Sequence, residues 1–165
     1  MIRTLEAGDV AALLPLNNAH AVELSELDEQ RFETLRAASF WALCTDDHSA
    51  FMLCFDQGAA YDGINFRWFK ARYSLFIYID RIVVAPEARG QGLARQFYDH
   101  LFAQARAVGH DLIVCEVNID PPNPASDAFH AKIGFAPVGQ ALLETRGKTV
   151  RYLAAKTPTP ASTAP

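Results

Sequence analysis

The chain has 165 residues, of which 50% are hydrophobic and 21% are charged, and its formal net charge is −4. This length suits one domain that buries its own core without disulfides or metals. The acidic balance argues against nucleic acid or an anionic membrane as the main partner. A polyanionic ligand would therefore need a local positive site.

Three cysteines, Cys44, Cys54 and Cys115, lie in apolar runs, and none forms a Cys-x-x-Cys pair. We expect buried thiols and no metal site, because an odd count without such pairs supports neither a disulfide framework nor zinc. The N-terminal residues lack the apolar core of a signal peptide, which predicts a cytoplasmic protein with no membrane partner. A monomer and a homodimer both stay open.

The first third of the chain predicts a short strand, two helices and a β-hairpin. In chain order it predicts a strand at 2–6, a helix capped by Asp9 through about residue 20, a helix capped by Asp28 through about Ser39, and a hairpin of strands at 40–45 and 50–55. Pro15 is expected to shorten or kink the first helix, because proline removes a helical hydrogen bond.

Residues 56–74 predict a long loop, because Gly58, Asp62, Gly63 and Asn65 are loop formers. Aromatic residues crowd between them at positions 61, 66, 68, 69 and 73. Two interpretations follow. The aromatics either pin the loop to the core, or the loop, with Trp68, forms a wall of a substrate pocket.

The rest of the chain predicts one βαβ unit followed by a helix and two strands. The elements are a buried strand at 75–84, an amphipathic helix at 93–108, a strand at 112–118, a short helix at 124–133, and strands near 135–142 and 149–156. The fold class is α+β (mixed α/β), with a single central, mostly antiparallel sheet of six or seven strands and about four helices. Residues 1–156 form one domain, and 157–165 read as a disordered tail.

Between the buried strand and the long helix, Arg89-Gly90-Gln91-Gly92 predicts an anion site. A helix N-terminus offers unpaired N–H groups and a positive dipole end, and glycines let the backbone approach a ligand closely. Arg89 adds a guanidinium, so the loop suits a pyrophosphate. The alternative is an ordinary glycine-containing turn.

Two rival phosphate motifs do not fit. A dinucleotide fingerprint needs a third glycine where this chain has Arg95, and a Walker A loop needs a glycine where it has Leu142. The loop is therefore not read as either motif.

The segment Val-Val-Ala-Pro-Glu-Ala-Arg-Gly-Gln-Gly-Leu-Ala resembles the coenzyme-binding segment of the GNAT acetyltransferase superfamily. Arg89, Gly92 and Ala94 fill the three fixed positions of the family pattern Arg/Gln-x-x-Gly-x-Gly/Ala. A second family segment, an Asn followed by a short helix and a Gly-Phe pair, is matched by Asn123 and positions 134–135. The resemblance covers about residues 1–156 and implies the acyl-CoA N-acyltransferase fold.

The resemblance also implies acetyl-CoA as co-substrate. Backbone groups on the strand would hold its pantetheine arm, at Ile82, Val83 and Val84. Loop and helix N–H groups would hold the pyrophosphate beside Arg89, at Gly90, Gln91, Gly92, Leu93, Ala94 and Arg95. A backbone N–H on the same strand would polarise the thioester carbonyl.

The family often carries an acid tyrosine four residues before the Gly-Phe pair, where this sequence has His130. Helical spacing from Asn123 places Ser126 and His130 on one polar edge, beside Phe129, and the resemblance turns this edge toward the coenzyme. His130 is either a candidate acid or coenzyme contact, since histidine titrates near neutral pH, or a solvent-facing residue without a role.

Two carboxylates are candidates for the base that deprotonates the amine. Asp80 lies within the buried strand, where alternation would place it on one face with Tyr78, Ile82 and Val84, and Glu116 lies within the next strand. Each could instead belong to a structural ion pair, for example Asp80 with Arg81. The residues alone do not choose between them.

Three functions follow from these patterns. The first is N-acetyl transfer to a primary amine of a small molecule or a peptide. The second is a non-catalytic acyl-CoA-binding module, and the third is transfer from a longer acyl-CoA. Turnover with a panel of amines separates the first from the second, and donor chain length separates the third.

Overall fold

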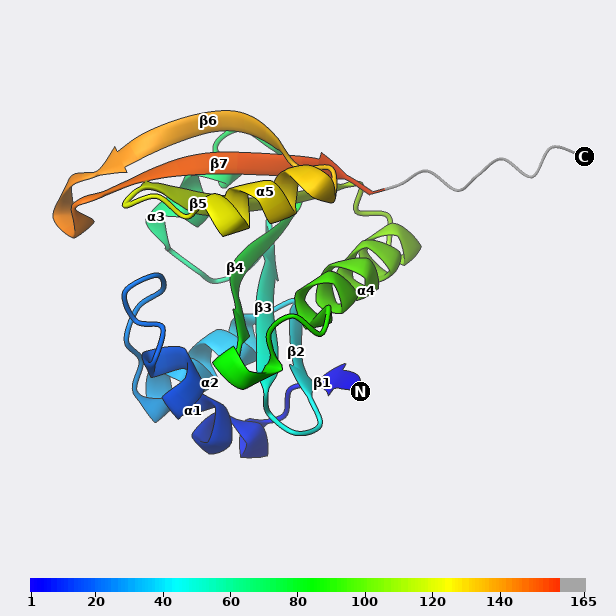
Figure 1. Ribbon diagram of the computed structural model, residues 1–165. Helices are drawn as coiled ribbons and strands as arrows, with labels where there is room; N and C mark the ends of the chain where they lie inside the picture. Colours follow the sequence, from blue (N-terminus) through cyan, green and yellow to red (C-terminus); the bar gives the residue numbers. More distant parts are fainter. Residues whose placement is uncertain (158–165) are drawn as a thin grey trace, which may run out of the picture.

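The computed structural model describes residues 1–157, which form one seven-stranded sheet flanked by helices (Figure 1). The strands are β1 (Ile2–Thr4), β2 (Trp41–Thr45), β3 (Ala50–Asp56), β4 (Ile77–Val84), β5 (Leu112–Asp120), β6 (Ala136–Leu143) and β7 (Lys148–Lys156). The helices are α1 (Val10–Asn18), α2 (Glu29–Ala38), α3 (Ile64–Lys70), α4 (Leu93–Ala107) and α5 (Pro124–Lys132), with short 3-10 turns η1 (Ala7–Asp9), η2 (Pro86–Ala88) and η3 (Glu144–Arg146).

The sheet order is β1-β2-β3-β4-β5-β7-β6, and only the β4–β5 pair among these strands is parallel. Helices α1, α2 and α3 pack on one face of the sheet, where Phe32 and Phe69 lie in the core. Helices α4 and α5 cover the other face through residues such as Phe97 and Leu101. The predicted fold class is confirmed, with one helix more than expected.

The two halves of the sheet separate between β4 and β5. Strands β4 and β5 pair only at Ile77↔Ile113 and Tyr78↔Val114, near their first residues. Beyond these pairs β4 stays with β3, whereas β5 follows β7. Figure 1 shows β5, β7 and β6 as an upper layer that diverges from β4 below it. A gap thus opens in the sheet just before the loop that leads into α4.

A β-bulge at Asp80 changes the side-chain alternation of β4. Arg81 pairs with Leu53 and Ile79 with Cys54, so Asp80 is the extra residue on its strand. The expected shared face of Tyr78, Asp80, Ile82 and Val84 is therefore wrong. Tyr78 packs in the core under α3, whereas Ile82 and Val84 pack on the side of α4.

The predicted loop at 56–74 is wrong in its middle, because Ile64–Lys70 form helix α3. Phe66 and Phe69, three residues apart, share the buried face of that helix. Trp68 stacks on the ring of Tyr152 in β7, with centroids 4.1 Å apart. Core burial of these aromatics outweighs the loop-forming glycines, which lie before the helix.

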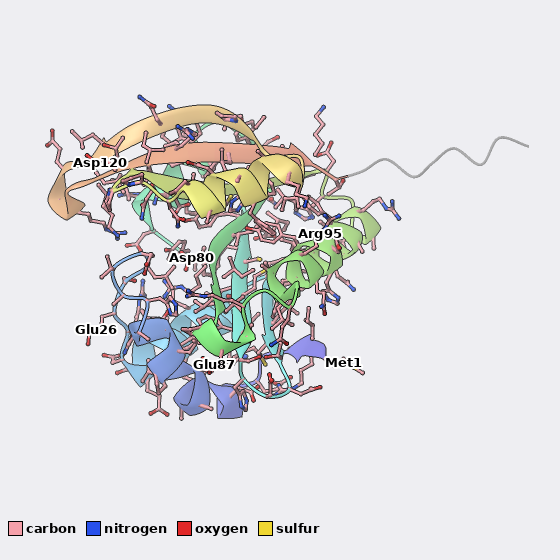
Figure 2. All side chains as sticks on the ribbon, in the orientation of Figure 1. Met1, Glu26, Asp80, Glu87, Arg95 and Asp120 are labelled. Carbon is pink, nitrogen blue, oxygen red and sulfur yellow. The ribbon has the colours of Figure 1, made fainter. Side chains whose placement is uncertain are left out.

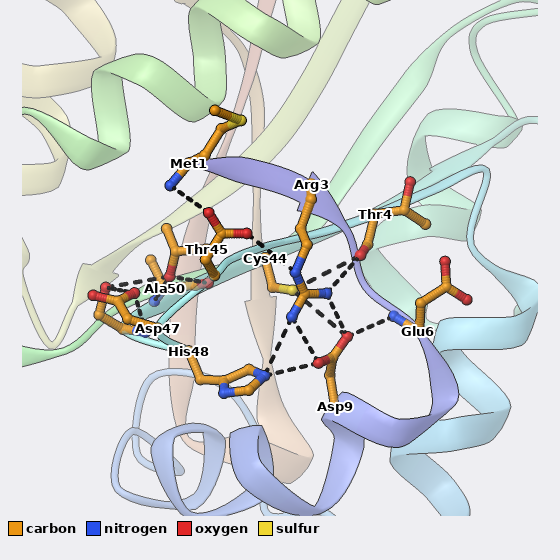
Figure 3. Close-up of polar contacts among 12 residues, drawn as sticks. Met1, Arg3, Thr4, Glu6, Asp9, Cys44, Thr45, Asp47, His48 and Ala50 are labelled. Atoms are coloured by element: carbon orange, nitrogen blue, oxygen red, sulfur yellow. Dashed lines mark hydrogen bonds and ion pairs between the residues drawn. The ribbon is translucent and has the colours of Figure 1, made fainter.

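Asp9 precedes α1 but does not cap it, because its side chain makes no capping hydrogen bond there. Its carboxylate instead accepts two hydrogen bonds from Arg3, at 2.7 and 2.8 Å, and lies 2.7 Å from His48 Nε2 (Figure 3). The Arg3 guanidinium holds the pKa of Asp9 well below its ordinary value. This cluster ties β1 to the β2–β3 hairpin and the start of α1, and so replaces the predicted cap.

Cys44, Cys54 and Cys115 are buried and free, as expected. Burial raises the pKa of Cys44 to about 11, so its thiol stays protonated at neutral pH. None of the helices within residues 1–157 has the length and hydropathy needed to cross a bilayer. The predicted tail lies outside the described residues, except for Thr157, whose N–H donates to the Asp111 carbonyl at 2.9 Å.

Candidate active site

A pocket occupies the gap where β4 and β5 diverge. Strand residues Asp80 and Glu116 line it from the two sides, and His130 lines it from α5. The segment between α1 and α2 and the turn before β7 complete its rim, through residues such as Glu23 and Arg146. Figure 2 shows Asp80 midway along β4, far from Asp120 at the end of β5. The pocket thus gathers the predicted base and acid candidates.

The loop before α4 presents a row of free backbone donors beside this gap. The first hydrogen bond of the helix runs from Gln96 N–H to the Gly92 carbonyl at 3.0 Å. Among residues 1–157, no protein acceptor is found for the backbone N–H groups from Gly90 to Arg95. Six consecutive unpaired donors at a helix N-terminus form a site for an anion such as a pyrophosphate.

Glycine is required at two positions of this loop by backbone conformation. Gly90 and Gly92 both have φ of 76°, in the left-handed region that other residues avoid. A Cβ added at either position would meet no protein atom within 4 Å. The space in front of these residues is therefore open, which leaves room for a ligand.

The Arg89 side chain points back to the strand rather than over the loop. Its Nε donates to the Val84 carbonyl at 3.3 Å, and its Nη2 donates to His20 Nε2 at 2.8 Å. Arg95 pairs with Asp99 one helical turn later, at 2.8 Å. The predicted phosphate contact of the Arg89 guanidinium needs a different rotamer from this one and stays a prediction.

Helix α5 begins as its sequence predicts. The Asn123 side chain accepts the Ser126 N–H at 3.2 Å, and Pro124 occupies the first turn. Asn123, Ser126 and His130 all line the pocket. Phe129 does not line it and packs instead against Tyr98 in the core, with ring centroids 5.3 Å apart.

His130 is buried, so the solvent-facing interpretation is wrong. Its Nδ1 lies 2.7 Å from the Ser126 carbonyl oxygen, and its Nε2 lies 2.7 Å from the Tyr98 hydroxyl. A carbonyl only accepts, so we assign the proton to Nδ1, and Nε2 then accepts from Tyr98. Burial lowers the pKa of His130 below its ordinary value, which keeps the ring neutral.

Asp80 belongs to a buried ion pair, as one interpretation of the sequence proposed. Its Oδ2 lies 2.7 Å from Arg81 Nε, and its Oδ1 accepts from Tyr61 Oη at 2.6 Å. Arg81 in turn donates to Asn17 Oδ1 at 2.8 Å. Both carboxylate oxygens are thus engaged, which argues against Asp80 as the group that receives a proton.

Glu116 has one engaged and one free oxygen. Its Oε1 accepts from Tyr78 Oη and from Asn65 Nδ2, each at 3.0 Å. Within residues 1–157, no hydrogen-bond partner is found for its buried Oε2. Burial, followed by the negative charge of Asp80, raises the pKa of Glu116 to about 8. A carboxylate tuned to that range is suited to general base catalysis near neutral pH.

The amino-acid sequence alone does not reveal the hydrogen-bond partners of Glu116 and His130. The sequence predicts Asn65 as a loop former and Tyr78 as part of one strand face with Asp80, and it assigns no role to the Tyr98 hydroxyl. Residue type and spacing do not indicate these contacts, because each of these three partners lies on a different element from the group that it contacts.

Within the described part of the chain, no group of three or more His, Cys, Asp and Glu side chains could hold a metal ion.

The architecture is similar to that of solved acetyltransferases. The ribosomal-protein-S18-alanine N-acetyltransferase from Escherichia coli matches with a TM-score of 0.69 and 18% identity, over 100% of this chain and 98% of that one. The putative acetyltransferase yncA from Salmonella typhimurium, solved with acetyl-CoA, matches with a TM-score of 0.69 and 20% identity, over 100% and 96%. A chimera of spermidine N-acetyltransferase SpeG from Vibrio cholerae and hSSAT matches with a TM-score of 0.68 and 18% identity, over 95% and 96%.

No curated protein sequence matches the chain. The sequence does match the family described as Acetyltransferase (GNAT) family over residues 16–135, which span the gap in the sheet, the loop before α4 and the whole of α5. The chain therefore belongs to the Acetyltransferase (GNAT) family.

Proposed function

We propose that this protein transfers an acetyl group from acetyl-CoA to a primary amine of a small molecule or a peptide, by direct attack of the amine on the thioester. The observation that carries the proposal is the row of unpaired N–H groups from Gly90 to Arg95, which opens beside the gap between β4 and β5. Family membership supports the same chemistry.

In this proposal the coenzyme enters along the gap. Its pyrophosphate binds at the N-terminus of α4, where the helix dipole and the free donors favour an anion. Its pantetheine arm follows the edge of β4 at Ile82, Val83 and Val84, where β5 has turned away and leaves that edge unpaired. The thioester then reaches the pocket lined by Glu116 and His130.

Glu116 acts as the base that takes a proton from the incoming ammonium. The neutral amine attacks the carbonyl carbon, the tetrahedral intermediate collapses, and the C–S bond breaks to release the coenzyme as a thiolate. The amide nitrogen loses its extra proton to solvent, and solvent protonates the thiolate. Glu116 then releases its proton to solvent, which restores the ionised base. Asp80 is not the base in this proposal, because Arg81 and Tyr61 engage both of its carboxylate oxygens.

His130 contacts the coenzyme in this proposal and does not supply the proton. Its proton on Nδ1 is directed at the Ser126 carbonyl, and its Nε2 accepts from Tyr98. A neutral imidazole is a poor acid, because the ring must first be protonated to donate near pH 7. The side chain instead fixes the wall of the pocket next to Asn123.

We expect the reaction to take place in the cytoplasm, because three free buried thiols suit a reducing compartment.

The test of the proposed function is turnover of acetyl-CoA with amines of two kinds, peptides with a free N-terminus and small polyamines, with the acetylated product identified by mass. Binding of acetyl-CoA without any product would favour the non-catalytic module. Faster turnover of a longer acyl-CoA would favour the third function.

A further inference from the structure

We propose that Asn65, on α3, is a positioning residue for the catalytic base: together with Tyr78 it occupies one oxygen of Glu116, so that only the other oxygen receives the proton of the acceptor amine. The inference rests on the proposed function, because it takes Glu116 as the base. Asn65, Tyr78 and Glu116 line the same pocket but come from three different elements.

A chain of hydrogen bonds leads from β7 through α3 to β5. Tyr152 Oη donates to Asn65 Oδ1 at 2.9 Å, and Asn65 Nδ2 donates to Glu116 Oε1 at 3.0 Å. A carboxylate only accepts, so the amide must turn its NH₂ group toward Glu116. Its oxygen then faces Tyr152, whose hydroxyl must donate. The direction of every bond in the chain is thereby fixed.

The two donors leave Glu116 asymmetric. Tyr78 Oη and Asn65 Nδ2 both approach Oε1 at 3.0 Å, which fills the two lone pairs of that oxygen. Oε2 is buried and has no partner within residues 1–157. A proton that arrives at Glu116 therefore binds Oε2, because Oε1 could take it only by losing a donor.

Helix α3 holds the Asn65 amide in a fixed place. Only 7% of the residue is exposed, and its neighbour Phe66 is fully buried in the core. Trp68, one turn on, stacks on the same Tyr152 ring that donates to Asn65, with centroids 4.1 Å apart. Packing of α3 against β7 thus sets the geometry of a carboxylate on β5.

Other ionisable groups also surround Glu116 and must stay constant in a test. Those that act on it or are acted on by its charge are Asp80, Tyr61, Tyr78, Tyr98, Cys115 and Tyr152. Asp80 pairs with Arg81, whose Nε lies 2.7 Å from Asp80 Oδ2. Replacement of Asn65 leaves this ion pair untouched.

The experiment measures the Glu116 carboxyl directly, by carbon-13 NMR titration of labelled glutamate in wild type and Asn65→Leu, together with kcat against pH. Removal of the donor destabilises the ionised form, so the pKa of Glu116 should rise by about one unit or more from its value near 8. At pH 7 kcat should fall roughly tenfold and recover at higher pH, because each unit leaves about ten times less ionised base. KM for acetyl-CoA should not change.

Two further variants keep the test decisive. Tyr78→Phe removes the other donor to Oε1 and should raise the same pKa, so it serves if Asn65→Leu does not fold. Tyr73→Phe makes the same chemical change in the aromatic group around Phe69, outside this hydrogen-bond chain, and should leave the titration unchanged.

An unchanged Glu116 titration in a folded Asn65→Leu or Tyr78→Phe protein, alongside an active wild type, overturns the positioning role and leaves the acetyl transfer standing. Full activity of Glu116→Gln overturns the positioning role as well, since Glu116 would not be the base. A wild type that acetylates no amine overturns both the inference and the proposed function.

Discussion

The hydroxyl of Tyr98 on α4 lies 2.7 Å from Nε2 of His130 on α5, so the imidazole is held between two helices with both nitrogens engaged. We predict that His130→Ala reduces kcat by less than about tenfold, because the ring shapes the pocket rather than donates a proton. Loss of a general acid costs about 10²-fold or more. The measurement is kcat against pH for wild type, His130→Ala and His130→Tyr on one acceptor. A 10²-fold loss in the alanine variant that tyrosine restores would assign the acid role to His130.

In the proposed mechanism, the pH dependence of the reaction is set by Glu116. Its folded pKa is about 8, so the ionised base becomes available as the pH rises through that value. We predict that kcat increases from pH 6 to about pH 9 with a midpoint near 8. A rate that is flat over this range would exclude Glu116 as the group that limits turnover.

The stability contributed by Glu116 should show the opposite trend with pH, because its pKa differs between the folded and the unfolded state. The pKa of Glu116 is raised from an ordinary 4.5 to about 8, so the folded state binds a proton that the unfolded state releases between these values. The contribution of Glu116 to the free energy of unfolding should then fall as the pH rises from about 4.5 to 8, by an order of a few kcal/mol. Denaturant unfolding of wild type and Glu116→Gln at several pH values measures this. The lowered pKa of His130 adds an opposite slope to both proteins, so the difference between them isolates Glu116, and an equal slope in both would contradict the shift.

We predict that Gly92→Val abolishes coenzyme binding, because the new side chain occupies the open space in front of the anion site. Gly92 has φ of 76°, so valine there also destabilises the fold by about 1–2 kcal/mol. Gly109→Val is the matched control, since Gly109 has φ of 83° and open space but lies at the other end of α4. Calorimetry with coenzyme A should show lost affinity in the first variant and normal affinity in the second. Equal affinities in two folded variants would refute the loop assignment.

Trp68 stabilises the fold and does not line the pocket. Its ring stacks on Tyr152. The Arg72 guanidinium also lies over the Trp68 ring, with 3.8 Å between the guanidinium carbon and the ring centroid. We predict that Trp68→Ala lowers the free energy of unfolding by about 2–4 kcal/mol and leaves the acceptor KM within a factor of about two. The test is thermal unfolding of wild type and Trp68→Ala, together with the acceptor KM of each protein. A raised acceptor KM without loss of stability would restore the pocket-wall interpretation.

Local signals in the sequence predicted the elements well. Asn123 and Pro124 predicted the start of α5, because capping and proline preference depend on neighbouring residues alone. Glycines at 90 and 92 predicted the open turn before α4, since positive φ is a property of single residues.

Non-local packing decided the rest. The bulge at Asp80 depends on how β3 and β4 align, so the strand sequence alone gave the wrong alternation. Helix α3 depends on burial of Phe66 and Phe69 between sheet and loop, which outweighs the local turn formers. The choice between Asp80 and Glu116 needed their partners, which include Tyr61 in the loop after β3 and Asn65 on α3.

The most direct test measures two quantities for wild type and Glu116→Gln at pH 8. They are the amount of acetylated amine formed per acetyl-CoA consumed, determined by mass, and the rate of its formation. We predict one acetylated amine and one free coenzyme thiol per turnover in wild type, and a rate at least about 10²-fold lower in Glu116→Gln with unchanged acetyl-CoA affinity. Equal rates in the two proteins, or consumption of acetyl-CoA without an acetylated amine, would contradict it.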